Sequence, residues 1–420
     1  MPNVLILAYD FPPRGGVGVM RITKWTRYLP EFGWQPTIVT VSDPGPHPDL
    51  HLLDQVRGTS VLRIPARYPP LPMGEAARVQ DVSTPSSAWR RRLKPWIIPD
   101  VQVGWIPGAV RLAEARLAQG DIAALLTTGP PFSTSLAGLW LKRRHPTLPW
   151  LMDLRDLWSE GPDQRFVVQY KVNRWLEQCC LDAANHTTVV TAGIRTLMLR
   201  RLRIAPERIS TIPNGFDPND LPPETLAPAQ SGPLQLCYIG TMAAHRAAAA
   251  EGVFIALRQL QAEGVTAAQL HVAFIGSFAP ALHDWAAPLV AAGLVTVEGF
   301  VPHDAALARM RAAHALLLVL TDDWEGRIAH SSKLFEYLAV GRPILAVVPP
   351  GEAAQLVQGT GAGVAVAPTD VAGIADALRE WLGKHAAGTL ATRIDPAALR
   401  PYERREQAQH VSRLLGHITN

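Results

Sequence analysis

The sequence predicts an α/β protein with two doubly wound domains, each built around a parallel sheet. The chain has 420 residues, which is longer than a single hydrophobic core usually organises. Short apolar runs alternate with helix-length segments along most of it, as in successive βαβ units. A stretch rich in proline and polar residues, Ile212–Pro233, interrupts the alternation and is typical of a linker. We therefore expect one such domain on each side of that stretch.

The first forty residues show the repeating unit most clearly. An apolar run at Val4–Ala8 precedes proline and glycine residues, and a helical pattern then covers about Val19–Phe32. Gly33 ends this helix, and Thr37–Val41 forms a second apolar run. Short runs without polar alternation are typical of parallel strands that are buried on both faces. Further strands of the first domain are expected at Ile122–Thr127, Trp150–Leu154 and Thr187–Thr191.

The alternation resumes after the linker and predicts the second domain. Its strands are expected at Leu234–Ile239, His271–Ile275, Val295–Val297, Leu316–Leu320 and Ile344–Val348. The final segment, Glu403–Ile418, is polar and helical in period. We expect a first domain over residues 1–215, a second over residues 216–400, and a C-terminal helix at about 401–420 that packs back on the first domain.

The composition is that of a globular protein, with 48% hydrophobic and 18% charged residues. The formal net charge is only +4, although the pI is about 9.1, which favours anionic ligands or surfaces over nucleic acid. The three cysteines lack metal-ligand spacing and fit a reduced, cytoplasmic compartment. The N-terminus lacks the basic region of a signal peptide, and no segment reaches the roughly 20 apolar residues of a membrane span. We expect a protein that is soluble in the cytoplasm or attached peripherally to the inner face of the plasma membrane.

One segment, Ser87–Pro107, stands out by its mixture of basic and aromatic residues. It interleaves four basic residues with three tryptophans, namely Arg90, Arg91, Arg92 and Lys94 with Trp89, Trp96 and Trp105. Indoles beside basic residues suit a membrane interface or an anionic, lipid-linked acceptor. A loop that packs its tryptophans on the domain is the alternative interpretation.

The stretch HSSKLFEYLAVGRPILAV, His330–Val347, predicts a helix start with an unusual charge. Ser332 is a natural N-cap residue, which places Lys333 in the first turn, where the helix dipole disfavours a cation. Glu336 is not spaced as a capping-box partner, and Lys preceding Glu at i, i+3 is the weaker order for an ion pair. A lysine beside free helix N–H groups suits a diphosphate, and a carboxylate one turn later can accept two ribose hydroxyls. A solvated surface pair is the alternative.

Two glycine-containing stretches follow predicted strands. In DFPPRGGVGVMR, Asp10–Arg21, Gly15 and Gly16 lie between a strand and a helix, where the backbone can approach a phosphate. Residues 16, 18 and 21 are Gly, Gly and Arg, so the full dinucleotide fingerprint is absent, and a simple tight turn is an equal alternative. In CYIGTMAAHR, Gly240 ends the first strand of the second domain, and Arg246 could reach a phosphate there.

The stretch PWLMDLRDLW, Pro149–Trp158, places charged residues where a strand of the first domain ends. Asp153, Arg155 and Asp156 are candidates for a general base or for groups that orient an acceptor. A structural ion pair and helix cap is an equal alternative.

These stretches, taken in order, resemble the family-four glycosyltransferases of the GT-B fold over essentially the whole chain. The matching pieces are the opening strand with its GG loop, TTGPPFS, MDLRDLW, IPNGFD, YIGT and SSKLFEYLAVGRPI. The resemblance is nearest to the bacterial group that builds cell-surface polysaccharides. It implies two Rossmann-like domains that face a cleft, a nucleotide-sugar donor held mainly by the second, retention of anomeric configuration, and no required metal or other cofactor.

The resemblance also implies roles for particular residues. Glu336 would hold the donor ribose, Lys333 and Arg246 its diphosphate, and the Gly15–Gly16 loop would close on it. Further donor-binding residues would be Gly240, Gly276, Phe300, Val301, Ser332 and Leu334, and the catalytic candidates are Asp153, Arg155 and Asp156. Many members carry another glutamate eight positions before the one that corresponds to Glu336, and this chain has Ile328 there. The histidine that usually ends a strand of the first domain is also absent, and Arg155 or Asp156 lies near its place.

The sequence therefore predicts a retaining glycosyltransferase that moves a sugar from a nucleoside diphosphate to a glycan or lipid-linked acceptor. The alternatives are a transferase with a small natural-product acceptor, a nucleotide-sugar 2-epimerase, and a non-catalytic sugar-nucleotide binding module. The sequence does not distinguish the nucleobase, the sugar, the linkage or the oligomeric state.

Overall fold

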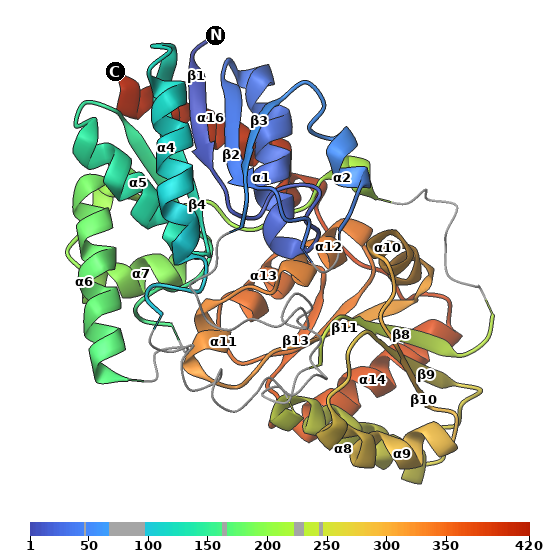
Figure 1. Cartoon of the computed structure of the whole chain (residues 1–420). Helices are drawn as coiled ribbons and strands as arrows, with labels where there is room; N and C mark the ends of the chain where they lie inside the picture. Colours follow the sequence, from blue (N-terminus) through green and yellow to red (C-terminus); the bar gives the residue numbers. More distant parts are fainter. Residues whose placement is uncertain (46–47, 67–96, 162–165, 222–230, 243–246) are drawn as a thin grey trace. The chain divides into compact units, whose positions relative to one another are not determined.

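The computed structural model describes residues 1–45, 48–66, 97–161, 166–221, 231–242 and 247–420 (Figure 1). The chain forms two compact units. The first unit comprises Met1–Pro213 and Arg404–Asn420, and the second comprises Asn214–Glu403. The chain therefore passes between the units twice, at 213–214 and at 403–404.

The first unit contains a seven-stranded, wholly parallel sheet in the order β3-β2-β1-β4-β5-β6-β7. The strands are β1 (Asn3–Leu7), β2 (Gln35–Val41), β3 (Ser60–Ile64), β4 (Ile122–Gly129), β5 (Trp150–Leu154), β6 (His186–Val189) and β7 (Ile209–Thr211). Leu5 of β1 is paired with Thr37 of β2 on one side and with Leu125 of β4 on the other. The strand order reverses between β1 and β4, which makes the carboxyl ends of these two strands a topological switch point.

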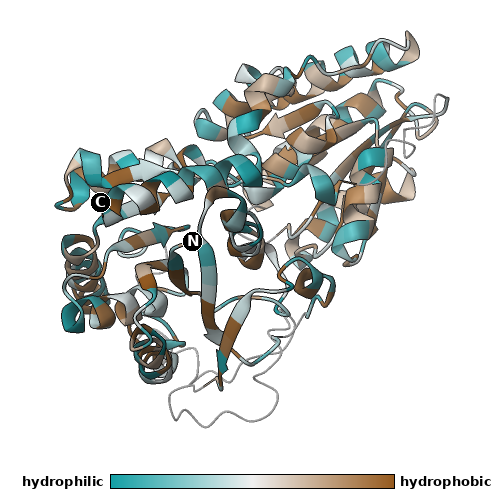
Figure 2. Ribbon diagram, turned by 90° about the horizontal axis from the view of Figure 1, so that it is seen from above, coloured by the Kyte–Doolittle hydropathy of each residue, from teal (hydrophilic) through white to brown (hydrophobic). Residues whose placement is uncertain are grey.

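The helices of the first unit connect these strands and cover the sheet. They are α1 (Val17–Tyr28), α2 (His51–Asp54), α4 (Ile106–Leu117), α5 (Ser133–Arg144), α6 (Val167–Ala183), α7 (Ala192–Arg201) and α16 (Arg404–Thr419). The C-terminal helix α16 packs against α1 near the start of the chain (Figure 1). Its Ala408, Val411 and Leu415 share a helix face and join the core cluster that contains Trp25. Its remaining residues are mostly polar, and the helix is correspondingly rich in hydrophilic colour in Figure 2.

The second unit contains a six-stranded parallel sheet in the order β10-β9-β8-β11-β12-β13. The strands are β8 (Leu234–Ile239), β9 (Leu270–Ile275), β10 (Val295–Glu298), β11 (Ala315–Val319), β12 (Ile344–Val347) and β13 (Gly363–Val366). Its helices are α8 (Ala247–Ala262), α9 (His283–Ala291), α10 (His303–Ala312), α11 (Trp324–Ile328), α12 (Ser332–Val340), α13 (Glu352–Gly359), α14 (Val371–Ala386) and α15 (Pro396–Leu399). The switch point of this sheet lies between β8 and β11.

The second sheet is buried on both faces. Leu236 and Tyr238 of β8 belong to the core cluster on one face, and Cys237 and Ile239 belong to the cluster on the other. This explains why the strand is apolar at every position except the exposed Gln235, rather than alternating. The predicted fold class, α/β with two doubly wound parallel sheets, is confirmed.

Three strands, β3, β7 and β13, are absent from the sequence prediction. Two of them, β3 and β13, are edge strands whose residues are mostly half-buried, and β7 is an edge strand of only three residues. Edge strands cover less core, so their sequences lack the long apolar runs that mark central strands. The central strands β5 and β8 have the predicted limits.

The basic and aromatic segment is only partly covered, because residues 67–96 lie outside the described residues. Its last tryptophan, Trp105, is 1% exposed, and its ring lies edge-on to Tyr9 at 5.7 Å between centroids. Trp105 therefore belongs to the core of the first unit, which corrects the interfacial interpretation for this residue. Within the described ranges, no helix combines the length and the hydrophobicity that a bilayer crossing requires.

Candidate functional site

Helix α12 begins at the carboxyl edge of the second sheet and carries the unusual lysine. Its N-cap is Ser331, one residue earlier than predicted, so Lys333 is the second helical residue and Glu336 the fifth. The Ser331 side chain forms no capping hydrogen bond. Leu334 and Phe335 are fully buried and hold the first turn on the core. The helix start therefore presents backbone N–H groups and Lys333 without a carboxylate cap.

Tyr238 and Tyr337 fix the position of Lys333. The fully buried Tyr337 of α12 accepts a hydrogen bond from the backbone N–H of Ile239 at 3.0 Å, which ties the helix to the end of β8. Burial raises the pKa of Tyr337 well above its usual value, so this hydroxyl stays protonated. The Lys333 ammonium donates to the Tyr238 hydroxyl at 3.2 Å and lies 4.8 Å from the centre of that ring.

Two glycines allow close packing beside the switch point: Gly240 leaves room for Lys333, and Gly276 leaves room for the backbone of Gly240. Gly240 follows β8 with φ of +118°, and a Cβ there would lie 2.3 Å from Cε and Nζ of Lys333. Gly276 follows β9 with φ of +125°, and a Cβ there would lie 2.6 Å from the carbonyl oxygen of Gly240. Both positions need glycine for backbone conformation and for close approach. The sheet edge, the two glycines and the helix start therefore form one compact site in the second unit.

Glu336 lies one turn beyond Lys333 and is partly exposed, at 26%. Its Oε1 is 3.9 Å from Nε2 of His303, the first residue of α10. The sequence analysis did not single out His303, although a histidine that opens a helix after a strand-end loop is a detectable signal. Phe300 is 78% exposed, whereas Val301 packs against the core cluster beneath α12. Arg246 and its neighbours 243–245 lie outside the described residues.

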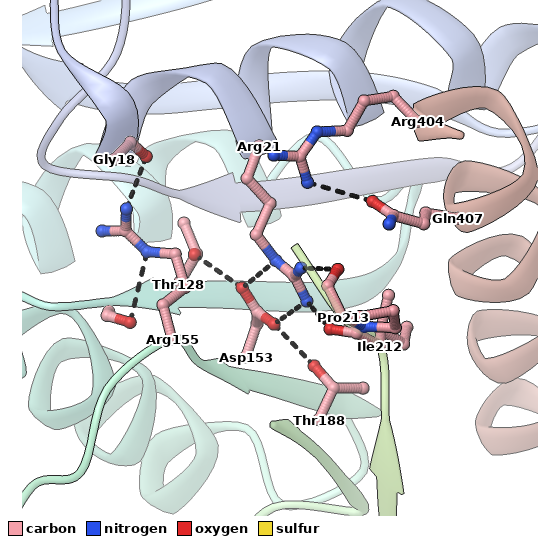
Figure 3. Close-up of polar contacts among 11 residues, drawn as sticks. Gly18, Arg21, Thr128, Asp153, Arg155, Thr188, Ile212, Pro213, Arg404 and Gln407 are labelled. Carbon is pink, nitrogen blue, oxygen red and sulfur yellow. Dashed lines mark hydrogen bonds and ion pairs between the residues drawn. The ribbon is translucent and has the colours of Figure 1, made fainter. Parts of the chain in front are cut away.

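In the first unit, Asp153 forms a buried ion pair with Arg21 of α1 (Figure 3). The side chains are 0% and 1% exposed, and the guanidinium donates to both carboxylate oxygens at 2.9 and 3.2 Å. The hydroxyls of Thr128 and Thr188 donate to the same carboxylate at 2.8 and 2.7 Å. Arg21 therefore supplies the charge that compensates a fully buried carboxylate at the end of β5.

Arg21 also binds the chain at its exit from the first unit. It donates to the carbonyl oxygens of Ile212 at 2.9 Å and Pro213 at 2.7 Å, directly before the crossing at 213–214. Burial lowers the pKa of Arg21, and Asp153 opposes that shift. The pair thus joins α1, the ends of β4, β5 and β6, and the segment after β7.

Arg155 follows β5 and connects the first turn of α1 with the end of β4 at the carboxyl edge of the first sheet (Figure 3). It donates to the carbonyl oxygens of Gly18 at 2.5 Å and Gly129 at 3.3 Å, and also to that of Pro130. A Cβ at Gly18 would lie 2.6 Å from the Arg155 guanidinium, so this glycine leaves space for it. Arg155 therefore anchors the first turn of α1, rather than extending freely into solvent.

The remaining candidates of the first unit lie at the surface of the same edge. Asp156 is exposed, in contrast to Asp153 three residues earlier. Gly15 is half-buried, and Gly16 is exposed with φ of +101° as the N-cap of α1.

Glu177 of α6 is buried below the segment that follows β5, where it accepts a hydrogen bond from the backbone N–H of Ser159 at 3.0 Å. Burial raises the pKa of Glu177 to about 7.

Two models of known protein families match the chain, one in each half. Residues 15–215 match the family described as glycosyl transferase 4-like domain, and residues 233–384 match the glycosyl transferases group 1. A search of curated protein sequences gives no significant match.

Solved structures resemble the chain over nearly its full length. A sucrose-phosphate synthase from Thermosynechococcus elongatus is 15% identical, with 99% of this chain and 98% of that chain covered and a TM-score of 0.63. A glycosyltransferase from Rickettsia africae ESF-5 is also 15% identical, with 99% and 98% covered and a TM-score of 0.65. A protein assigned as UDP-N-acetylglucosamine 2-epimerase from Listeria monocytogenes is 11% identical, with 97% and 94% covered and a TM-score of 0.58. At these identities the likeness shows a shared fold.

Proposed function

Because its first domain belongs to the glycosyl transferase 4-like family and its second to the glycosyl transferases group 1, this chain is a glycosyltransferase of the GT-B type that uses a nucleotide sugar, and we propose how it acts. The proposed reaction moves a sugar from a nucleoside diphosphate to a glycan or lipid-linked acceptor, with retention of anomeric configuration. Surface-polysaccharide synthesis at the inner face of the plasma membrane is the proposed setting. The basic and tryptophan-rich residues 87–96 support such an acceptor through their sequence alone.

The observation that carries the proposal is the placement of Lys333. Its ammonium is held on Tyr238 and next to Gly240, at the uncapped start of α12 and at the carboxyl edge of the sheet. Helix N–H groups and a fixed cation together form a site for a diphosphate. As the bond to the sugar breaks, negative charge grows on the departing diphosphate, and these groups stabilise it.

We propose roles for the other predicted donor-binding residues as well. Glu336 accepts the ribose hydroxyls, and the exposed Phe300 with Val301 contacts the nucleobase. Ser332 contributes its backbone N–H to the helix start, while the buried Leu334 positions the turn. We also propose that Gly276 acts with Gly240, that Arg246 contacts the diphosphate, and that the Gly15–Gly16 loop approaches the donor.

Among the three catalytic candidates we assign different roles. Asp153 and Arg155 are positioning residues, because their charged groups are bonded to other parts of the first unit. Asp156 is an exposed residue at the same sheet edge, desolvation of its carboxyl raises the pKa of that group, and it is the candidate that touches the acceptor.

A thermal-shift screen against UDP, GDP, dTDP and their sugars tests this function. A ligand present at a hundred times its dissociation constant should stabilise the protein by about 2.7 kcal/mol. The stabilising nucleotide sugar is then incubated with glycan, lipid-linked and small natural-product acceptors, and products are analysed. Isomerised sugar without an acceptor would indicate a 2-epimerase, and binding without turnover would indicate a binding module. If no nucleotide or nucleotide sugar stabilises the protein, the proposal is wrong.

Replacing Gly240 by alanine is expected to weaken nucleoside diphosphate binding by about tenfold or more. The new Cβ would displace the Lys333 ammonium, and a hydrogen bond to a charged group is worth about 1.5–3 kcal/mol. Gly264→Ala is the matched control, because Gly264 has φ of +97° in the same unit but nothing within 4 Å of a Cβ. Both variants should lose about 1–2 kcal/mol of stability from backbone strain. Equal affinities of the two variants in calorimetric titration would contradict this role for Gly240.

A further inference from the structure

Helix α6 of the first unit turns polar side chains toward the protein. Its buried face carries Asn173 and Glu177, which are 1% and 2% exposed. Oδ1 of Asn173 accepts a hydrogen bond from the indole N–H of Trp158 at 3.2 Å, and Glu177 accepts the backbone N–H of Ser159 at 3.0 Å. These bonds hold α6 on the segment that follows β5, so the opposite side of the helix faces outward.

The outward side of α6 is an apolar stripe with one cation. Val168 and Trp175 are 61% and 62% exposed, and because they are seven positions apart they lie on one line along the helix surface. Lys171 is exposed between them, and Val172 is half-buried. These four residues form the α6 stripe. A surface helix usually keeps its apolar side on the core, and exposed apolar residues that cluster on one face mark an interaction site.

Basic residues flank the α6 stripe on one side. The end of α7 and the residues after it carry three exposed arginines, which form the basic rim: Arg200, Arg201 and Arg203. The Arg174 side chain donates to the carbonyl oxygen of residue 201, and the Gln178 side chain exchanges hydrogen bonds of 2.8 and 2.9 Å with the backbone of residue 203. Arg174 and Gln178 each lie three positions after a stripe residue, so the rim runs beside the stripe.

The charges of this surface match an anionic lipid bilayer. Lys171 and the basic rim are exposed cations, and the exposed acid among residues 167–183 and 200–203 is Asp182, two turns beyond Trp175. Each basic residue near an anionic bilayer strengthens binding by about fivefold. A stable protein–protein interface takes roughly 20–30 residues on each side, far more than the stripe and rim contain. A single helix suffices for a bilayer, because it buries only one apolar face at the head-group boundary.

The stripe begins near the edge of the first sheet that carries Asp156. A helix that connects parallel strands runs opposite to them, so α6, which follows β5, starts at the carboxyl edge of the sheet. It lies beside α5 and α7 at the outside of the first unit (Figure 1). Lipid bound along the first half of α6 is therefore close to the residue proposed to touch the acceptor.

We propose that the α6 stripe and the basic rim dock the first unit on an anionic phospholipid bilayer. The valines and the Trp175 indole enter the head-group boundary, and Lys171 and the rim bind lipid phosphates. The inference rests on the proposed function, since it gives the lipid-linked acceptor of that function a docking surface beside Asp156. It assigns this contact to a helix within the described ranges and is independent of residues 87–96.

Co-sedimentation of the full chain with vesicles tests the proposal. Vesicles of phosphatidylcholine with phosphatidylglycerol should bind the wild type at least tenfold more tightly than pure phosphatidylcholine, and added salt should weaken this binding. The double variant Val168→Ser with Trp175→Ser should bind the anionic vesicles at least tenfold more weakly, because its apolar contact is lost. Lys171→Gln should weaken binding by about fivefold. Thermal unfolding should be nearly unchanged in these variants, since the replaced side chains are exposed.

Two variants of the second unit serve as matched controls. Trp324 is 49% exposed and Lys384 is 47% exposed, so Trp324→Ser and Lys384→Gln remove the same residue types at similar exposure. Both should bind anionic vesicles within about twofold of the wild type.

Four results would overturn the inference: no binding of the wild type to anionic vesicles, equal binding to neutral ones, wild-type binding by the double variant, or a wild-type dimer that the double variant dissociates. The last result would assign the stripe to a second copy of the chain. If neutralising Arg90–Arg92 abolishes binding while the double variant binds normally, residues 87–96 make the contact instead. The double variant should keep its affinity for the nucleoside diphosphate, so loss of lipid binding alone leaves the proposed transferase reaction intact.

Discussion

Replacing Arg21 by methionine is expected to lower the free energy of unfolding of the first domain by about 3–5 kcal/mol. The substitution keeps much of the side-chain volume but leaves the Asp153 carboxylate buried without a cation. It also removes the donors to the carbonyl oxygens of Ile212 and Pro213. Urea unfolding can be followed by tryptophan fluorescence, because the Arg21 guanidinium lies 4.1 Å from the centre of the Trp25 ring.

A matched variant separates the buried pair from an ordinary surface pair. Arg405 and Glu31 form an ion pair in the same unit with side chains that are 53% and 43% exposed. Arg405→Met should therefore cost no more than about 1 kcal/mol. The double variant Arg21→Met with Asp153→Asn should be more stable than Arg21→Met alone, since the uncompensated charge is gone. A loss for Arg21→Met no larger than that for Arg405→Met would show that the pair does not stabilise the domain.

Replacing Lys333 by alanine is expected to reduce kcat/KM for the nucleotide sugar by roughly 10- to 150-fold. The estimate follows from the loss of a hydrogen bond to a charged group, worth about 1.5–3 kcal/mol, at the departing diphosphate. Stability should change by less than about 1 kcal/mol, because the lost contact with Tyr238 is offset by removal of a cation from a helix N-terminus. Steady-state kinetics and thermal unfolding of the same preparation give both quantities.

The control for this experiment is a lysine of the same domain far from the site. Lys384 of α14 pairs with Glu380 on the surface, and both side chains are about half exposed. Lys384→Ala should leave kcat/KM unchanged within about twofold. If Lys333→Ala loses stability but keeps its activity, the lysine is a structural residue, and the diphosphate site must be sought elsewhere.

The sequence located the central strands well and the edge strands poorly. The runs at 150–154 and 234–239 were predicted with the limits that the structure has, since strands buried on both faces are mostly apolar, and each of these contains a single polar residue, Asp153 or Gln235. Strands β3, β7 and β13 lie at sheet edges and carry weaker patterns. The start of α12 was misplaced by one residue, because Ser331 and Ser332 are equally good N-cap types in sequence.

The role of Arg21 shows what a motif alone cannot reveal. In the sequence it was only the residue that occupies the last glycine position of a dinucleotide fingerprint. In the structure it compensates Asp153, which is 132 residues distant along the chain. The alternative that Asp153 belongs to a structural ion pair was stated from the sequence, but its partner could not be named there. Long-range pairing depends on which strands become neighbours, and local patterns do not encode that order.

The sequence by itself determined the doubly wound α/β architecture and the family, because hydrophobic periodicity and short motifs are local properties of the chain. It also placed Lys333 and Glu336 on one helix start, since their spacing follows from helical geometry. Only the tertiary structure decided that Tyr238 and Gly240 hold Lys333 and that Arg21 neutralises Asp153. These features depend on burial and on contacts between distant segments, which exist only after the sheets have formed.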